Sequence, residues 1–182
     1  MLSGPNLDLL GDRQPEIYGR EALADHIRQA VDEAARHGMV IEHHQSNHEG
    51  ELVELVHAAR HRAAGIVVNP GALSHYSWAL HDALAAFDGP VVEVHLSNPA
   101  SREPWRHTSV VAPVASGTIA GFGGLGYRLA VHALAGIFAA SAPSAPSAPS
   151  AGGARRGEPT EHPDAGNPAG NQVDMPEGKV FQ

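Results

Sequence analysis

Residues 90–106 read PVVEVHLSNPASREPWR, and this stretch decides the fold of the chain. The aliphatic residues of VVEVHL, framed by Pro90 and by the turn sequence SNP, predict a buried strand that ends in a turn. Glu93 and His95 are two residues apart, so their side chains leave the same face of that strand. A carboxylate beside an imidazole fixes the tautomer of the ring and favours its charged form. We interpret the pair as an acid/base device.

The same stretch continues with polar and basic side chains. Ser97 extends the face that carries the pair, and Arg102 and Arg106 follow four residues apart, a spacing that lets two guanidinium groups converge on one anion. Open α/β sheets bind ligands at the carboxyl ends of their strands, so this run favours a ligand site. The alternative is a surface histidine beside a glutamate, followed by two solvated arginines.

Working outward, strands alternate with helices along the chain. Periodic apolar residues predict helices at 21–37, from 51 onward, at 76–87 and at 118–139. Strands are expected at the very start, at 39–44, at 63–69, in the stretch quoted above and at 109–114. Strands separated by helices of this length indicate an α/β fold with a parallel sheet and right-handed crossovers.

Polar side chains gather where the predicted strands end. They are Asn6, Asn69, His75, Glu93, His95 and Ser97. Because the carboxyl ends of parallel strands meet at one rim, a single polar site is expected there. The aperiodic loop up to Arg20 also holds Arg13 and Tyr18, and a fixed cation lowers the pKa of a nearby tyrosine by roughly 1 to 3 units, which favours a phenolate base. A tyrosine that only packs the loop is the alternative.

Composition restricts the class of protein. The chain has 182 residues, and we expect one globular domain at 1–140 and a disordered tail rich in Ala, Ser, Pro and Gly at 141–182. A net charge of -8 argues against a nucleic-acid surface. There is no cysteine, and the only lysine is Lys179, so disulfides and an imine mechanism in the body are excluded. No apolar run has the length of a membrane span, so a soluble cytoplasmic protein is expected.

Two other patterns allow competing interpretations, and a third motif is absent. Residues 121–126, GFGGLG, match the dinucleotide pattern G-x-G-x-x-G, but glycines that let a helix pack closely are the preferred interpretation. Five histidines could indicate a zinc site, but we interpret their spacing as chance. They are His43, His44, His48, His57 and His61. No G-x-S-x-G serine-hydrolase motif is present. We therefore expect no metal and no cofactor.

Several long segments carry a family resemblance. GPNLDLLGDRQPEIYG, QSNHEGELVELVHAAR, IVVNPGALSHYSWALHDAL, VVEVHLSNPASREPWRHTSVVAPVASGTIAGFG and GYRLAVHAL, in this order, resemble type II 3-dehydroquinate dehydratase. The resemblance implies a flavodoxin-like three-layer sandwich with a five-stranded parallel sheet, assembled as a dodecamer of four trimers. It also implies dehydration of 3-dehydroquinate to 3-dehydroshikimate through an enolate, in the shikimate pathway or in quinate breakdown, without metal, cofactor or imine.

The resemblance also implies roles for individual residues. Tyr18 would remove the proton next to the ketone, with Arg13 lowering its pKa, and Asn6 would hold a water against the enolate oxygen. His95, oriented by Glu93, would protonate the departing hydroxyl. The substrate-binding residues would be Asn69, His75, Leu96 through its backbone, Ser97 and Arg106, with Arg102 latching a lid at about 10–19 and Asp82 reaching in from a neighbouring subunit.

The start of the chain departs from the family pattern. Members begin with a longer hydrophobic strand, whereas only Met1-Leu2-Ser3 precede GPN here, so the first strand is expected to be truncated. Two alternatives follow: a non-catalytic module that binds small anions on the same scaffold, and an inactive family member.

Overall fold

A single parallel sheet organises the computed structural model, which describes residues 1–12 and 20–141. Its five strands have the order β2-β1-β3-β4-β5, and every pairing is parallel. They are β1 (Leu2–Ser3), β2 (His44–Gln45), β3 (Ile66–Asn69), β4 (Val91–His95) and β5 (Gly117–Ala120). This is the flavodoxin-like order. Strand β2 is added on one side of β1 and strands β3 to β5 are added on the other, so the strand order reverses beside β1. The expected fold class is confirmed.

The first strand is short and lies inside the sheet. Leu2 pairs with His44 on one side and with Val68 on the other, and Ser3 pairs in the same way with Gln45 and Asn69. The two residues of β1 therefore join β2 to the rest of the sheet.

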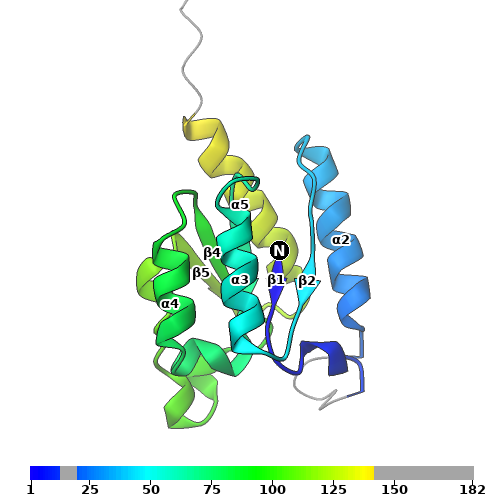
Figure 1. Ribbon diagram of the computed structural model, residues 1–182. Helices are drawn as coiled ribbons and strands as arrows, with labels where there is room; N and C mark the ends of the chain where they lie inside the picture. The colour runs from blue at the N-terminus through cyan, green and yellow to red at the C-terminus, as the bar shows by residue number, and fades with distance from the viewer. Residues whose placement is uncertain (13–19, 142–182) are drawn as a thin grey trace, which may run out of the picture. The chain divides into compact units, whose positions relative to one another are not determined.

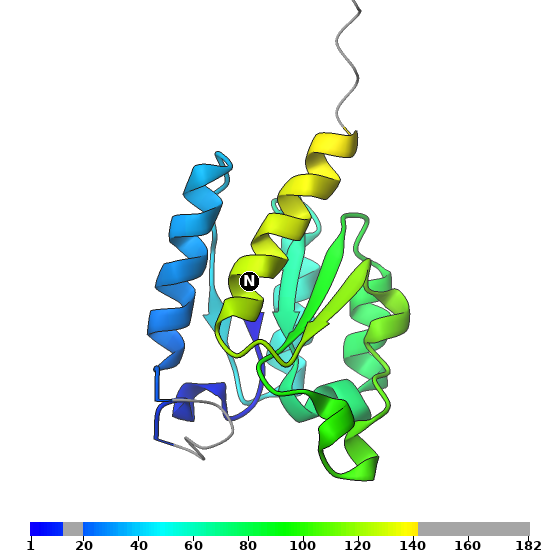
Figure 2. The ribbon, with the colours of Figure 1, turned by 180° about the vertical axis from the view of Figure 1, so that it is seen from behind.

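Helices cover both faces of the sheet (Figures 1 and 2). The helices α2 (Leu23–Arg36) and α5 (Leu125–Ser141) lie on one face, and α3 (Glu49–Ala59) and α4 (Trp78–Ala85) lie on the other. Each face has its own apolar core. Val92 and Val94 of β4 pack towards α2 and α5, whereas Val91 packs towards α3 and α4. The alternation follows from the two-residue period of a strand.

Three of the predicted elements are wrong in whole or in part. Residues 109–114 form no strand: the segment ends in a short 3-10 helix, Ala112–Val114, because Pro113 donates no backbone hydrogen bond. The fifth strand is Gly117–Ala120 instead, and it takes up the start of the helix predicted at 118–139, so α5 begins only at Leu125. The strand predicted at 39–44 is reduced to His44–Gln45. The other helices agree with the prediction within about two residues.

The glycine-rich segment 121–126 connects β5 to α5 and lets the helix approach its neighbours. A Cβ atom on Gly124 would lie 2.1 Å from the ring of His26, and one on Gly126 would lie 3.3 Å from Val94. The His26 ring is buried, stacks on Tyr127 with 6.1 Å between ring centroids, and has no hydrogen-bond partner among the described residues. These glycines serve close packing, as the sequence suggested.

Within residues 1–12 and 20–141, no helix combines the length and the hydropathy needed to cross a membrane.

Candidate active site

A cavity opens beyond the carboxyl ends of β1, β3 and β4, beside the point where the strand order reverses. Ligands bind at this point in open α/β sheets. Seven of the residues singled out from the sequence line it: Asn6, Asn69, His75, His95, Leu96, Ser97 and Arg106. Pro5, Leu7, Leu10, Gly71, Ala72 and Pro99 complete the lining. Five of the six polar side chains of the predicted rim thus line one cavity, and Glu93 is the exception.

Glu93 and His95 form a hydrogen-bonded pair at the end of β4. Nε2 of His95 lies 2.9 Å from Oε1 of Glu93, and the Glu93 side chain is 0% exposed. An ionised carboxylate only accepts hydrogen bonds, so Nε2 donates and the tautomer of the ring is set. His95 lines the cavity, whereas Glu93 lies behind it. The arrangement suits a histidine that exchanges a proton with a ligand.

The buried carboxylate of Glu93 is held by two further donors. The hydroxyl of Ser109 donates to Oε1 at 2.8 Å, and that of Thr118 donates to Oε2 at 3.3 Å. An isolated carboxylate in an apolar interior is costly, and these hydrogen bonds offset that cost. The sequence did not indicate either hydroxyl as a partner of Glu93, because each comes from a segment whose structure was predicted wrongly.

His75 faces His95 across the cavity. The two rings are nearly parallel, with 6.5 Å between their centroids. Nδ1 of His75 lies 2.8 Å from the carbonyl oxygen of Thr108, so Nδ1 carries the proton and donates. Burial lowers the pKa of His75 and outweighs the hydrogen bond to Thr108, which raises it, while the nearby Arg106 guanidinium lowers it further. His75 is therefore a neutral group suited to hydrogen bonding with a ligand.

Asn69 is held from behind by α5. Its Nδ2 donates to the hydroxyl oxygen of Tyr127 at 3.0 Å, and its Oδ1 accepts from the backbone N–H of Gly71 at 3.3 Å. Burial raises the pKa of Tyr127, which therefore stays a neutral phenol. Tyr127 is a part of the site that sequence reasoning missed.

Asn6 follows β1 in the left-handed conformation, with φ 65°. Asparagine tolerates this region better than most residues because its short side chain forms local hydrogen bonds. The backbone N–H of Asn6 donates to Oδ1 of Asn47 at 2.7 Å, and Nδ2 of Asn47 donates to Asp8 at 3.2 Å. The turn that presents Asn6 is thus secured by a residue from the loop before α3.

The two arginines of the quoted stretch contact the same anion, which belongs to this chain. That anion is the carboxylate of Glu103: its Oε2 lies 2.8 Å from Nε of Arg106 and 3.4 Å from Nε of Arg102. The Arg106 guanidinium also stacks over the Trp105 ring at 3.9 Å. Arg102 approaches the hydroxyl of Ser97 at 3.4 Å. A ligand carboxylate has a ready binding mode here, in exchange for Glu103.

Two predicted residues among those that the structure describes, Arg102 and Asp82, do not line this cavity. Arg102 lines an adjoining hollow with His26 and Ser97 instead. Asp82 of α4 has a side chain that is 86% exposed and lies 4.0 Å from His81 of its own chain. Arg13 and Tyr18, with the rest of 13–19, lie outside the described residues, as does the tail from 142 onward.

The described residues include one group of three side chains placed for a metal ion: Glu33, His37 and His132. None of the three lines the cavity.

Comparison with known proteins supports this fold. The family model for Dehydroquinase class II matches residues 1–135. The chain is 55% identical to 3-dehydroquinate dehydratase 2 of Pseudomonas putida over 72% of this chain and 88% of that protein. It is 53% identical to 3-dehydroquinate dehydratase 1 of Agrobacterium fabrum over 76% of this chain and 96% of that protein.

A solved structure gives the same result. The type II dehydroquinase from Propionibacterium acnes superposes with a TM-score of 0.72 at 41% identity, covering 74% of this chain and 93% of that one. Sequence and structure comparisons therefore place the chain in the class II dehydroquinase family, whose members are hydro-lyases.

Proposed function

We propose that the protein removes water from 3-dehydroquinate to give 3-dehydroshikimate, the reaction that the names of its relatives imply for those proteins. The observation that carries the proposal is the buried Glu93–His95 pair opening into a cavity that also holds Asn6, Asn69, His75 and Arg106. A site that only binds an anion has no need of a buried carboxylate that orients a histidine.

The elimination proceeds in two steps. Tyr18, as a phenolate, takes the proton next to the ketone, and the electron pair moves into an enolate. Asn6 holds a water that donates to the enolate oxygen. The enolate then collapses, the bond to the departing hydroxyl breaks, and His95 supplies the proton with which that hydroxyl leaves as water. Arg13 lowers the pKa of Tyr18. The roles of Tyr18 and Arg13 rest on the family resemblance alone.

The remaining side chains bind the substrate. His75, kept neutral, and Asn69, held by Tyr127, contact the substrate together with Arg106, Ser97 and the backbone of Leu96. These groups bind its hydroxyls and its carboxylate. When the substrate binds, Arg106 releases Glu103 and contacts the substrate instead. Arg102, which also contacts Glu103, latches the lid.

Turnover tests the proposal directly. Purified protein is mixed with 3-dehydroquinate, and the ultraviolet absorption of the conjugated enone product is followed with and without prior borohydride treatment. We expect turnover that survives borohydride and is lost in His95→Ala, while His57→Ala, which removes an exposed histidine of α3, keeps it. Binding of a substrate analogue by His95→Ala without turnover separates the chemistry from binding. Near-normal turnover in His95→Ala would show that the role assigned to His95 is wrong.

Two alternatives are resolved by the same assay. Analogue binding with no turnover in the unaltered chain supports the non-catalytic anion-binding module. If neither binding nor turnover is seen, a version extended upstream of Met1 is tested. Activity in the extended version alone would show that the short first strand causes the lack of activity. We place the reaction in the shikimate pathway, with quinate breakdown as the alternative.

We also propose that the protein assembles as a dodecamer of four trimers and that Asp82 completes the site of a neighbouring subunit. Asp82 is exposed on α4, and the large side chains of Tyr76 and Trp78 at the start of that helix are exposed as well. A cluster of exposed aromatic residues is typical of an interface.

Complementation tests the shared site. His95→Ala and Asp82→Ala subunits, each inactive alone, are co-assembled. Recovery of a fraction of the activity supports a site built from two chains. If the mixture stays inactive although light scattering shows mixed oligomers, Asp82 does not act across the interface.

A further inference from the structure

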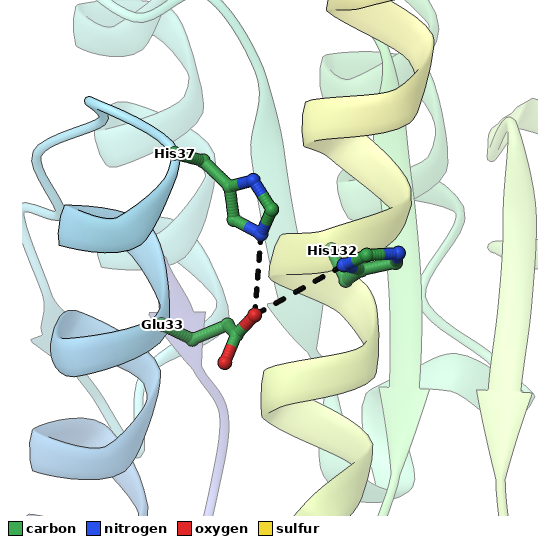
Figure 3. A group of neighbouring side chains, drawn as sticks. All are labelled: Glu33, His37 and His132. Carbon is green, nitrogen blue, oxygen red and sulfur yellow. Dashed lines mark hydrogen bonds and ion pairs between the residues drawn. The ribbon is translucent and has the colours of Figure 1, made fainter.

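The group formed by Glu33, His37 and His132 lies on the face of the molecule that carries α2 and α5 (Figure 3). Glu33 belongs to α2, His37 follows that helix directly, and His132 belongs to α5. Their side chains point towards one another across the gap between the two helices. Nothing in the proposed reaction uses them.

One oxygen of Glu33 faces both histidines. Oε1 lies 3.2 Å from Nε2 of His37 and 4.0 Å from Nδ1 of His132. All three ligand atoms lie within 4.8 Å of one another. Ligand atoms around a tetrahedral zinc ion with bonds of about 2.0–2.1 Å lie roughly 3.3–3.4 Å apart, so the Glu33–His37 separation already fits.

The other carboxylate oxygen is held by arginines. Oε2 of Glu33 lies 2.8 Å from Arg36 and 3.9 Å from Arg128. The Glu33 side chain is only 12% exposed, so it is fixed by its surroundings. Carboxylates that bind metals are commonly hydrogen-bonded through their second oxygen in this way, which orients the first.

His132 can complete the geometry. Its side chain is 71% exposed, so its ring can move the short distance towards Glu33 without disturbing the core. The His37 and His132 rings already touch edge to face, with 5.2 Å between centroids.

We propose that Glu33, His37 and His132 bind a divalent transition-metal ion of the zinc type, with water in the fourth position. Two imidazoles and one carboxylate suit zinc, nickel or copper, whereas magnesium and calcium prefer oxygen ligands alone. The competing interpretation is a surface ion pair in which Glu33 only neutralises Arg36 and a protonated histidine.

The bound ion would link α2 to α5. Both helices contribute to the same apolar core, through residues such as Ala30 and Tyr127. Because the three ligands come together only in the folded chain, metal binding raises the stability of the folded state. The site is independent of the proposed dehydration.

Calorimetry with zinc chloride tests the site on the full chain after removal of any histidine tag. We expect one zinc ion per chain, and a weakening of more than about tenfold in His132→Ala, which removes one of three ligands. His61→Ala, which removes an exposed histidine outside the group, is the matched control and keeps the affinity within about twofold. Zinc should also raise the thermal unfolding midpoint of the unaltered chain and of His61→Ala, but not that of His132→Ala.

Cobalt provides a second readout, since its visible absorption reports coordination by nitrogen and oxygen ligands. The spectrum of the unaltered chain should disappear in His132→Ala and in His37→Gln. The proposal is overturned if the unaltered chain binds zinc no more tightly than His132→Ala does, or if His61→Ala weakens binding to the same extent.

Discussion

Nδ2 of Asn69 donates a hydrogen bond of 3.0 Å to the hydroxyl of Tyr127, so a cavity residue on β3 is tied to a buried residue on α5. Tyr127→Phe leaves this amide donor without its partner. We expect a loss of about 1–3 kcal/mol in the free energy of unfolding and a rise in KM that exceeds the fall in kcat. Denaturant unfolding and steady-state kinetics measure the two effects. His57→Ala, at an exposed residue of α3, should change neither. Unaltered KM and stability in Tyr127→Phe would mean that Asn69 does not depend on Tyr127.

The carboxylate of Glu93 accepts hydrogen bonds from His95, Ser109 and Thr118. Glu93→Gln keeps the size of the side chain but removes the charge that orients and stabilises the charged imidazole. We expect kcat to fall by about 10²–10⁴, the usual contribution of a positioned general acid. Turnover assays measure this, with circular dichroism to check the fold. Glu54→Gln, on the exposed side of α3, should keep full activity, and equal activity in Glu93→Gln would contradict the role of the pair.

The stability of the fold should fall on acidification because of His43. Burial lowers the pKa of His43 from 6.5 to about 4. The unfolded chain therefore takes up a proton at a higher pH than the folded chain, so stability is lost as the pH falls from 6.5 towards 4. Urea unfolding midpoints at several pH values measure the slope.

His43→Gln should flatten that slope in part. Some dependence remains because His26 and His75 also have lowered pKa values. His61→Gln, at an exposed histidine, should leave the slope as it is. If His43→Gln showed the full slope of the unaltered chain, the ring of His43 would not be the group responsible.

Two glycines of the last helical region should respond to alanine in opposite directions. A methyl group on Gly124 would overlap the buried ring of His26, so Gly124→Ala should destabilise by about 1–3 kcal/mol. Gly136 lies in α5 with open space around it, so Gly136→Ala should stabilise by about 0.5–1 kcal/mol. The double variant His26→Ala/Gly124→Ala should lose less than the sum of the two single changes, which denaturant unfolding measures. Strict additivity would contradict the contact.

Much of the sheet was predictable because its strands are marked by aliphatic runs. The run VVEVHL gave β4 and the position of its polar pair, and IVVN gave β3. Asn69 and His95 then had to meet at one rim, since parallel strands end on the same side.

The remainder depended on tertiary context. β5 begins with glycine and threonine, both exposed, so it has no apolar run. Val110 and Val111 look like part of a strand, but they are buried without forming one, and Val111 packs into the apolar core with α3 and α4. The partners of Glu93 and Asn69 come from distant segments, and no local pattern indicates them. The cytoplasmic location, the disordered tail and the roles of Arg13 and Tyr18 stay predictions.

The contact between His26 and Gly124 also restricts how this sequence can have arisen. With histidine buried at position 26, any side chain at position 124 would occupy the space of the ring. A side chain at position 124 therefore requires the ring at position 26 to move or to be replaced. Among relatives, we expect histidine at the first position only where glycine stands at the second. The packing of a helix against the turn that faces it thus makes the residue allowed at one position depend on the residue at the other.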